Sequence, residues 1–148
     1  MSGSWSPTDF PNLTPQNHQI KSEETRNYNC LAWAAGEADR RWEPDIMEQW
    51  YWPDGVERDQ TIKAFVKAYM TLGYERCPDG RLEPGFEKIA IYAFEDGTAT
   101  HAARQLSSGV WTSKLGDFED IDHETLDCLI GPQYGKPVAY LRRKSLIV

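Results

Sequence analysis

The pattern of hydrophobic and polar positions changes halfway along the chain. In the first half, an alanine-rich run preceded by asparagines over residues 27–38 predicts a helix with Cys30 in its first turn. Apolar residues then recur at helical spacing from Asp59 to Leu72, and Gly73 provides a stop, so a second, amphipathic helix is expected there. We expect this second helix to serve as scaffold.

Beyond Gly85 the pattern becomes that of short strands. Strands are expected at residues 87–94, 98–106, 110–115 and 138–142. Tight turns at residues 95–97 and 107–109 favour antiparallel pairing of the first three. Because the helices precede the strands, the pattern predicts an α+β domain whose N-terminal helices pack on an antiparallel sheet.

The two turns set a register for the predicted sheet. Both are interpreted as three-residue loops that end in a left-handed glycine, so Phe94 opposes Thr98 and Ile91 opposes His101. A two-residue turn at 96–97 would instead pair His101 with Tyr92. In the first register, which we adopt, the face expected under the alanine-rich helix holds Ile89, Ile91, Ala93, Ala99, His101, Ala103, Gln105, Trp111, Ser113 and Leu115. The opposite face, with Lys88 and Lys114, is expected to be wetter.

Composition narrows the class of protein. A chain of 148 residues that is 40% hydrophobic fits one core, so residues 20–148 are expected to form a single domain. Residues 1–19, which hold three prolines, are expected to form an extended arm. The formal net charge of -7 argues against nucleic acid or an anionic membrane as partner. Neither a signal-peptide pattern nor a membrane-spanning apolar run occurs, so a cytoplasmic location is the default expectation.

The three cysteines differ in their surroundings. They include no CxxC motif, so neither a disulfide framework nor a zinc site is indicated, and no metal or cofactor is expected. Cys77 falls in a turn and Cys128 in an apolar stretch. Cys30 is different because a thiol at a helix N-terminus feels the positive end of the helix dipole, and an imidazole at the helix–sheet seam would hold it as a thiolate. His101 is the candidate imidazole, with Ser113 diagonally adjacent on the next strand.

Three sequence blocks carry a resemblance to a known family. Asn-Tyr-Asn-Cys-Leu-Ala-Trp-Ala at 27–34, Thr-His-Ala-Ala-Arg-Gln-Leu at 100–106 and Trp-Thr-Ser-Lys-Leu-Gly at 111–116 resemble the papain-like superfamily, especially its NlpC-type amidase and peptidase branch. They also resemble an uncharacterised bacterial group of small proteins, which implies no activity. The first resemblance implies a papain-like fold and acyl transfer on an amide of a peptide or peptidoglycan-like substrate.

In that mechanism Cys30 attacks the carbonyl and His101 passes a proton to the leaving group. The Cys30 amide, with the side chain of Asn27 or Asn29, would stabilise the oxyanion. A simple N-cap is the alternative role for Asn29.

The resemblance leaves two alignments open. In the NlpC-type branch the catalytic histidine commonly opens the strand before the hairpin, where this chain has Glu87 and Lys88, and under that alignment the base is missing. Under a papain-style alignment His101 is the base. Ser113, Asp117 or His123 would then orient it. We prefer the second alignment because the adopted register turns His101 toward the helix. His123 is otherwise interpreted as a surface or capping residue that begins a short helix through Leu129.

A tryptophan-rich segment supports a competing hypothesis. Residues 42–55 carry Trp42, Trp50 and Trp52 together with two prolines, and they form either a cover of the core or a wall of a substrate groove. Trp50, Trp52 and Trp111 are the candidate substrate-contacting aromatics. The same segment would equally serve a catalytically inactive, papain-like binding module that uses a tryptophan-rich surface. The sequence does not indicate an oligomeric state.

Overall fold

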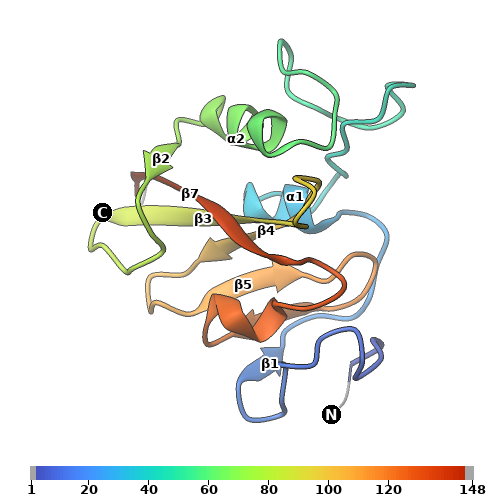
Figure 1. Cartoon of the computed structure of the whole chain (residues 1–148), viewed down its shortest axis with the longest axis vertical. Coiled ribbons are helices and arrows are strands. Elements are labelled where there is room, and N and C mark those ends of the chain that lie inside the picture. Colours follow the sequence, from blue (N-terminus) through green and yellow to red (C-terminus); the bar gives the residue numbers. More distant parts are fainter. Residues whose placement is uncertain (1–2, 146–148) are drawn as a thin grey trace.

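A seven-stranded antiparallel sheet organises the molecule (Figure 1). The computed structural model describes residues 3–145, so the ends of the predicted arm and domain, residues 1–2 and 146–148, lie outside the described residues. The strands are β1 His18–Ile20, β2 Glu75–Cys77, β3 Phe86–Ala93, β4 Ala99–Gln105, β5 Trp111–Lys114, β6 Asp120–His123 and β7 Lys136–Lys144. Their order across the sheet is β1-β6-β5-β4-β3-β7-β2. The chain therefore reaches each edge of the sheet with a three-residue strand.

The helices are short and begin at capping residues. Helix α1 spans Cys30–Ala34, and the Asn29 side chain accepts a hydrogen bond from the Ala32 amide at its start. It ends before Gly36, which adopts a positive φ of 86°. Helix α2 spans Ile62–Met70 and is capped in the same way by Thr61, and a 3-10 turn, η1, spans Leu126–Leu129. The predicted position of Cys30 in the first turn of a helix is confirmed, whereas the second helix begins at Ile62 instead of Asp59, and the two helices are only five and nine residues long.

The predicted fold class, a papain-like α+β domain of N-terminal helices on a sheet, is wrong. Strand β1 precedes the first helix, and the sheet contains three strands, β1, β2 and β6, that the pattern does not predict. The segment between α1 and α2 forms no helix, because two prolines and a positive-φ glycine interrupt it. The helix expected from His123 to Leu129 is a 3-10 turn, and His123 itself ends β6. The protein is a β-rich fold.

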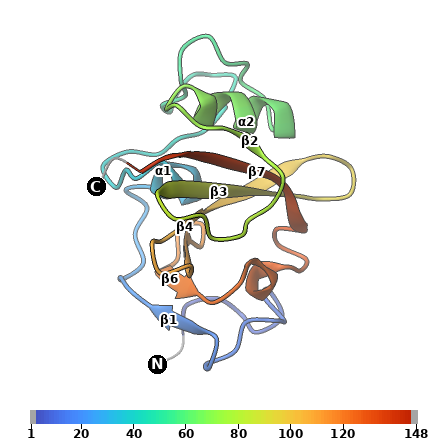
Figure 2. The same ribbon diagram turned by 90° about the vertical axis from the view of Figure 1, so that its left-hand side faces the viewer.

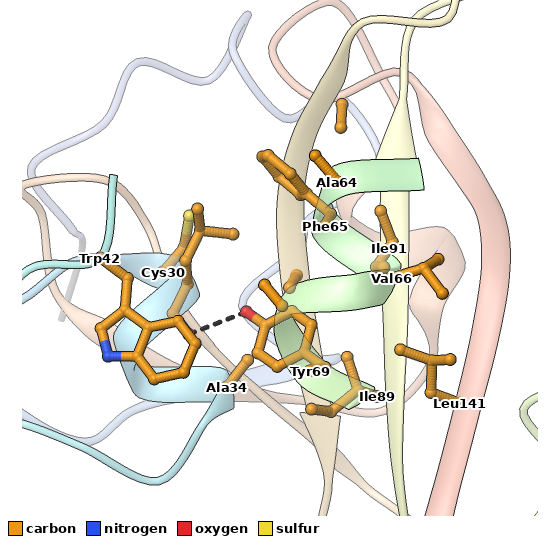
Figure 3. Packing of buried hydrophobic residues seen from close by; sticks show 14 of the residues in the cluster. Cys30, Ala34, Trp42, Ala64, Phe65, Val66, Tyr69, Ile89, Ile91 and Leu141 are labelled. Carbon is orange, nitrogen blue, oxygen red and sulfur yellow. Dashed lines mark hydrogen bonds between the residues drawn. The ribbon is translucent and has the colours of Figure 1, made fainter. Parts of the chain in front are cut away.

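Two hydrophobic clusters lie on opposite faces of the sheet. Figure 2 shows α2 above β3 and β7, and β1 at the opposite end of the molecule. The first cluster lies between the sheet and the two helices, and it includes Trp42, Phe65 and Ile91. Figure 3 shows how Tyr69 of α2 reaches across this cluster to donate a hydrogen bond of 2.8 Å to the Leu31 carbonyl of α1. Because the hydroxyl joins the helices directly, the two short helices stabilise each other.

The second cluster lies on the other face and is closed by the segment before β1. Phe10 is buried there, and its ring centroid lies 5.3 Å from that of Tyr134. Trp5 packs beside Phe10, with ring centroids 6.4 Å apart. The residues expected to form an arm thus supply part of this core.

A β-bulge between β3 and β4 decides which face each β4 residue occupies. The predicted three-residue turn is present, because the Phe94 amide donates to the Thr98 carbonyl and Gly97 has a φ of 91°. The pairing then shifts by one residue, so that Ala93 opposes Ala99 whereas Tyr92 opposes His101. One unpaired residue, Thr100, is inserted into β4. The adopted register of Ile91 opposite His101 is therefore wrong, since a one-residue shift moves every later side chain to the other face.

We predict that the Tyr69 hydroxyl stabilises the helix pair. Tyr69→Phe should lower the free energy of unfolding by about 1 kcal/mol, because one buried hydrogen bond is lost while the Leu31 carbonyl keeps its bond from the Ala35 amide. Urea denaturation of the two proteins measures the difference. The matched control is Tyr74→Phe, since the buried Tyr74 hydroxyl has no hydrogen-bond partner and its removal should cost nothing. Equal losses in both variants would contradict the prediction.

Candidate functional site

A cavity of about 300 Å³ opens beside the N-terminus of α1. Cys30 and Phe65 line its apolar part, while Arg41, Asp45 and Thr100 contribute polar groups. Cys30 is the first residue of α1 and is only 9% exposed. The structure thus places one member of the predicted catalytic pair next to a cavity.

The Cys30 thiol is not activated. Burial raises its pKa to about 11, and the main-chain amides of Ala102 and Leu31 only partly oppose that rise. A group with this pKa stays protonated at neutral pH, and the protonated thiol is a poor nucleophile. The position at a helix start therefore does not produce the thiolate expected from the sequence.

His101 lies on the opposite face of the sheet from Cys30. Cross-strand partners share a face, and His101 pairs with Tyr92 of the second cluster, whereas the next residue, Ala102, belongs to the first cluster with Cys30. The His101 Nε2 atom bonds Ser113, and its Nδ1 atom has no hydrogen-bond partner. The structure does not bring the cysteine and the histidine together as a catalytic pair.

Instead, His101 belongs to a buried chain of hydrogen bonds. Its Nε2 lies 3.0 Å from the Ser113 hydroxyl, which lies 2.8 Å from Nε2 of His123. The Nδ1 of His123 lies 2.8 Å from the Thr125 carbonyl. Two of the three candidates for the residue that orients His101, Ser113 and His123, are therefore joined to it in one chain, which we call the His–Ser–His chain. All three members are completely buried.

The Thr125 carbonyl determines the proton positions along this chain. A carbonyl only accepts, so Nδ1 of His123 carries the proton, and Nε2 of the neutral ring accepts from Ser113. The Ser113 oxygen then accepts from Nε2 of His101, which leaves Nδ1 of His101 with an unpaired lone pair. Burial lowers the pKa of His101 well below its usual value, with a further contribution from His123, so the ring stays neutral. The His101 ring also stacks on Tyr134, with centroids 4.0 Å apart.

The other predicted site residues have structural partners or lie apart. The Asn29 amide is fully engaged, since its oxygen accepts from Ala32 and Trp42 and its nitrogen donates to the Trp42 carbonyl. Asn29 therefore serves as the N-cap of α1, which was the alternative role expected from the sequence. Asn27 is exposed, and Asp117 pairs with Arg41 at 2.8 Å rather than with a histidine.

The predicted aromatic contacts divide between core and surface. Trp52 and Trp111 are buried, in the first and second cluster respectively, and Trp42 is buried beside Tyr69. Trp50 is 43% exposed, and the Arg41 guanidinium lies 5.5 Å from its ring centroid. Of the three candidate substrate-contacting tryptophans, only Trp50 faces solvent near the cavity.

Sequence reasoning missed the most exposed apolar residues, which lie next to Trp50. Ile46 is 84% exposed and Met47 is 79% exposed. They belong to residues 44–50, called here the 44–50 loop, whose first residues Pro44 and Asp45 also line the cavity. The signal was available in the sequence, because the Ile-Met pair between Asp45 and Glu48 belongs to no helical or strand pattern that would bury it.

The comparisons with known proteins identify a family without a known activity. A model of a family described as a domain of unknown function (DUF7689) matches residues 19–142. No curated protein and no solved structure matches the chain. Within residues 3–145, no helix has the length and apolar character needed to cross a membrane. The same residues contain no cluster of three metal-ligating side chains.

We predict that Cys30 reacts slowly with alkylating reagents. Because its pKa is about 11, the thiolate fraction at pH 8 is about 100-fold lower than that of a thiol with a pKa of about 9. The half-buried Cys77 is the internal reference, although burial also raises its pKa. Iodoacetamide labelling of the native protein, followed by peptide mass spectrometry, should show Cys30 modified at least about tenfold more slowly than Cys77. Faster labelling of Cys30 would restore the activated-thiolate hypothesis.

We predict a loss of stability between about pH 6.5 and pH 4. Burial lowers the pKa of His123 to about 4. In this pH window the imidazole therefore binds a proton in the unfolded chain but stays neutral in the folded chain. The contribution is complete above the unfolded pKa and falls by about 3 kcal/mol toward pH 4. Urea denaturation at several pH values measures it. His123→Gln keeps an acceptor for Ser113 but cannot titrate, so its stability should vary less across the window; an identical pH profile would refute the prediction.

Proposed function

We propose that this chain, which belongs to the DUF7689 family, is a binding module for a basic, amphipathic protein segment. The family itself implies no activity, because it is described only as a domain of unknown function. The docking surface is the 44–50 loop together with the adjoining cavity. The observation that carries the proposal is the exposure of Ile46 and Met47 on a loop that hydrogen bonds hold in place. Contiguous exposed apolar side chains on a soluble domain mark interaction surfaces.

The 44–50 loop is built to present these side chains. The Asp45 carboxylate accepts hydrogen bonds from the amides of Gln49 at 2.7 Å and Trp50 at 3.3 Å. The Arg58 guanidinium donates to the Asp45 carbonyl at 3.0 Å and to the Trp50 carbonyl at 3.2 Å. A loop fixed in this way loses little conformational entropy when a partner binds.

Backbone strain in the loop supports the same conclusion. Glu48 is the one described residue other than glycine with a positive φ, at 54°. A side chain in this left-handed region costs free energy, and such strain concentrates at sites of recognition. Here the strained residue directly follows the two most exposed apolar side chains. The loop conformation that includes this positive φ leaves Ile46 and Met47 exposed.

The charge around the loop selects the partner. Residues 37–59 contain eight carboxylates and only three arginines. Each of these arginines is already paired, Arg40 with Glu37, Arg41 with Glu43, and Arg58 with Asp45. The surplus negative charge favours a segment that alternates basic and apolar residues, with one apolar side chain entering the cavity above Cys30. Hydrolysis is not part of this proposal, because no described base contacts the Cys30 thiol.

A set of three synthetic peptides tests the proposal. A dye-labelled peptide of alternating Leu and Lys should bind the full chain in fluorescence anisotropy, while peptides of Leu with Glu and of Ser with Lys should not. Added salt should weaken the binding, because the charged groups are exposed. The double variant Ile46→Ser, Met47→Ser should reduce the affinity at least about tenfold, since buried apolar anchors carry most of the energy of an interface.

The matched control is Leu82→Ser, which removes another exposed apolar side chain, 47% exposed, from a loop outside the proposed surface. This variant should bind as the wild type does. Equal binding of the Leu-Glu peptide, or unchanged binding by the double variant, would refute the assignment of the 44–50 loop.

A further inference from the structure

Arg104 is an arginine without a counter-ion. Of the chain's nine arginines, all within the described residues, seven lie within ion-pair distance of a carboxylate. The two exceptions are Arg76, which is exposed, and Arg104, which is half-buried. The Nε atom of Arg104 is buried and has no hydrogen-bond partner. A buried, unpartnered donor on a charged group is costly, and in a chain with a net charge of -7 carboxylates are plentiful.

A second buried donor without a partner lies at the same end of the first cluster. Tyr74 is 3% exposed, and its hydroxyl has no hydrogen-bond partner. Arg104 of β4 pairs with Ile89 of β3, which pairs with Leu141 of β7. Tyr74 directly precedes β2 and packs in the cluster that contains Ile89 and Leu141. Arg104 and Tyr74 therefore flank the same part of the helix-facing side of the sheet, Arg104 from β4 and Tyr74 from the β2 side, and the Arg104 charge is near enough to act on the pKa of Tyr74.

The local charge is positive. The Arg143 guanidinium lies 4.6 Å from the centroid of the Tyr74 ring and pairs with Glu87 at 2.8 Å. Glu87 is thus neutralised, and Arg104 adds an uncompensated positive charge. Burial raises the pKa of Tyr74 to about 12, and the charges of Arg143 and Arg104 act against that rise. The phenol consequently stays protonated at neutral pH and can donate a hydrogen bond.

Trp33 supplies an apolar wall at this place. The Arg104 guanidinium lies 5.7 Å from the Trp33 ring centroid, and Trp33 packs against the first cluster. The indole Nε1 of Trp33 already donates to the Thr112 hydroxyl at 2.9 Å, so the ring is fixed in orientation. The guanidinium therefore rests against a rigid aromatic surface.

We propose that Arg104 and Tyr74 form a binding site for a small oxyanion, a carboxylate or phosphate group, with Trp33 as its apolar wall. Both unpartnered groups are donors, so they call for a ligand that accepts. Guanidinium groups bind planar or tetrahedral oxyanions through parallel hydrogen bonds, and a bound oxyanion would satisfy both donors at once. The site is independent of the 44–50 loop, because none of its residues lines that surface.

Thermal unfolding of the full chain with sodium acetate or with sodium phosphate, against sodium chloride at equal ionic strength, tests the site. The favoured anion should raise Tm by about 4 °C when present at about ten times its Kd, since it binds the folded state only. The Arg104 Nε–H resonance should shift during the same titration. Comparison of the acetate and phosphate titrations identifies the chemistry of the oxyanion.

Variants separate binding from general salt effects. Arg104→Gln and Tyr74→Phe should remove the anion-specific rise in Tm, and Tyr74→Phe should fold normally because its hydroxyl has no partner. Arg76→Gln is the matched control, because it removes an exposed arginine that likewise has no carboxylate partner, and its response should equal that of the wild type. A wild-type response no larger than in chloride, or an undiminished response in Arg104→Gln, would overturn the proposal.

Discussion

The insertion of Thr100 into β4 is the constraint on which the chemistry of this protein depends. Successive side chains of a strand alternate between the two faces of the sheet. One unpaired residue therefore moves each later side chain of the strand to the opposite face. Thr100 is held at this place by its own hydroxyl, which donates to the Tyr134 carbonyl at 2.6 Å. As a result Ala102 faces α1, where a small side chain lets the helix approach closely, and His101 faces the second cluster.

Buried polar groups obtain their hydrogen bonds in different ways on the two faces of the sheet. On the helix side, the Asn29 amide closes α1 and fixes the Trp42 backbone with the same three hydrogen bonds. On the other side, two imidazoles and a hydroxyl satisfy one another in a row, and their burial keeps the rings neutral. Neither arrangement needs a thiolate or a mobile proton. Five buried side-chain atoms of the described residues remain without a hydrogen-bond partner. The two donors, Arg104 Nε and the Tyr74 hydroxyl, lie on the helix side, whereas the other three, on His101, Gln105 and Asp120, are acceptors.

Local signals in the sequence predicted local structure well. The asparagine before Cys30 and the glycines at 97 and 109 determine a cap and two turns through contacts within a few residues, so the start of α1 and both hairpin turns follow from them. The hydrogen bond between His101 and Ser113 also joins residues expected to be diagonal neighbours. The bulge at Thr100 does not follow, because the carbonyl that stabilises it belongs to residue 134.

Partners that are distant in the sequence likewise explain why other predictions were wrong. Lys88 and Lys114 are buried although they were expected on a wet face, since Lys88 pairs with Glu83 at 2.9 Å and Lys114 donates to the Thr25 carbonyl at 2.8 Å. Strand β6 has a polar sequence that resembles a loop, and only its neighbours β1 and β5 make it a strand. The separation of Cys30 from His101 has the same kind of cause, because it depends on the one bulge.

The segment before β1 has a further consequence for how the chain folds. The Ser4 hydroxyl bonds Glu119, which is 115 residues away, and Asp9 accepts from Gln133 across 124 residues. Contacts this distant in sequence cannot form until the later partner has been synthesised, so Ser4 and Asp9 leave the ribosome long before Glu119 and Gln133 do. During that interval Trp5 and Phe10 are exposed to water, and the second face of the sheet is completed only after Tyr134 has emerged and can pack on Phe10.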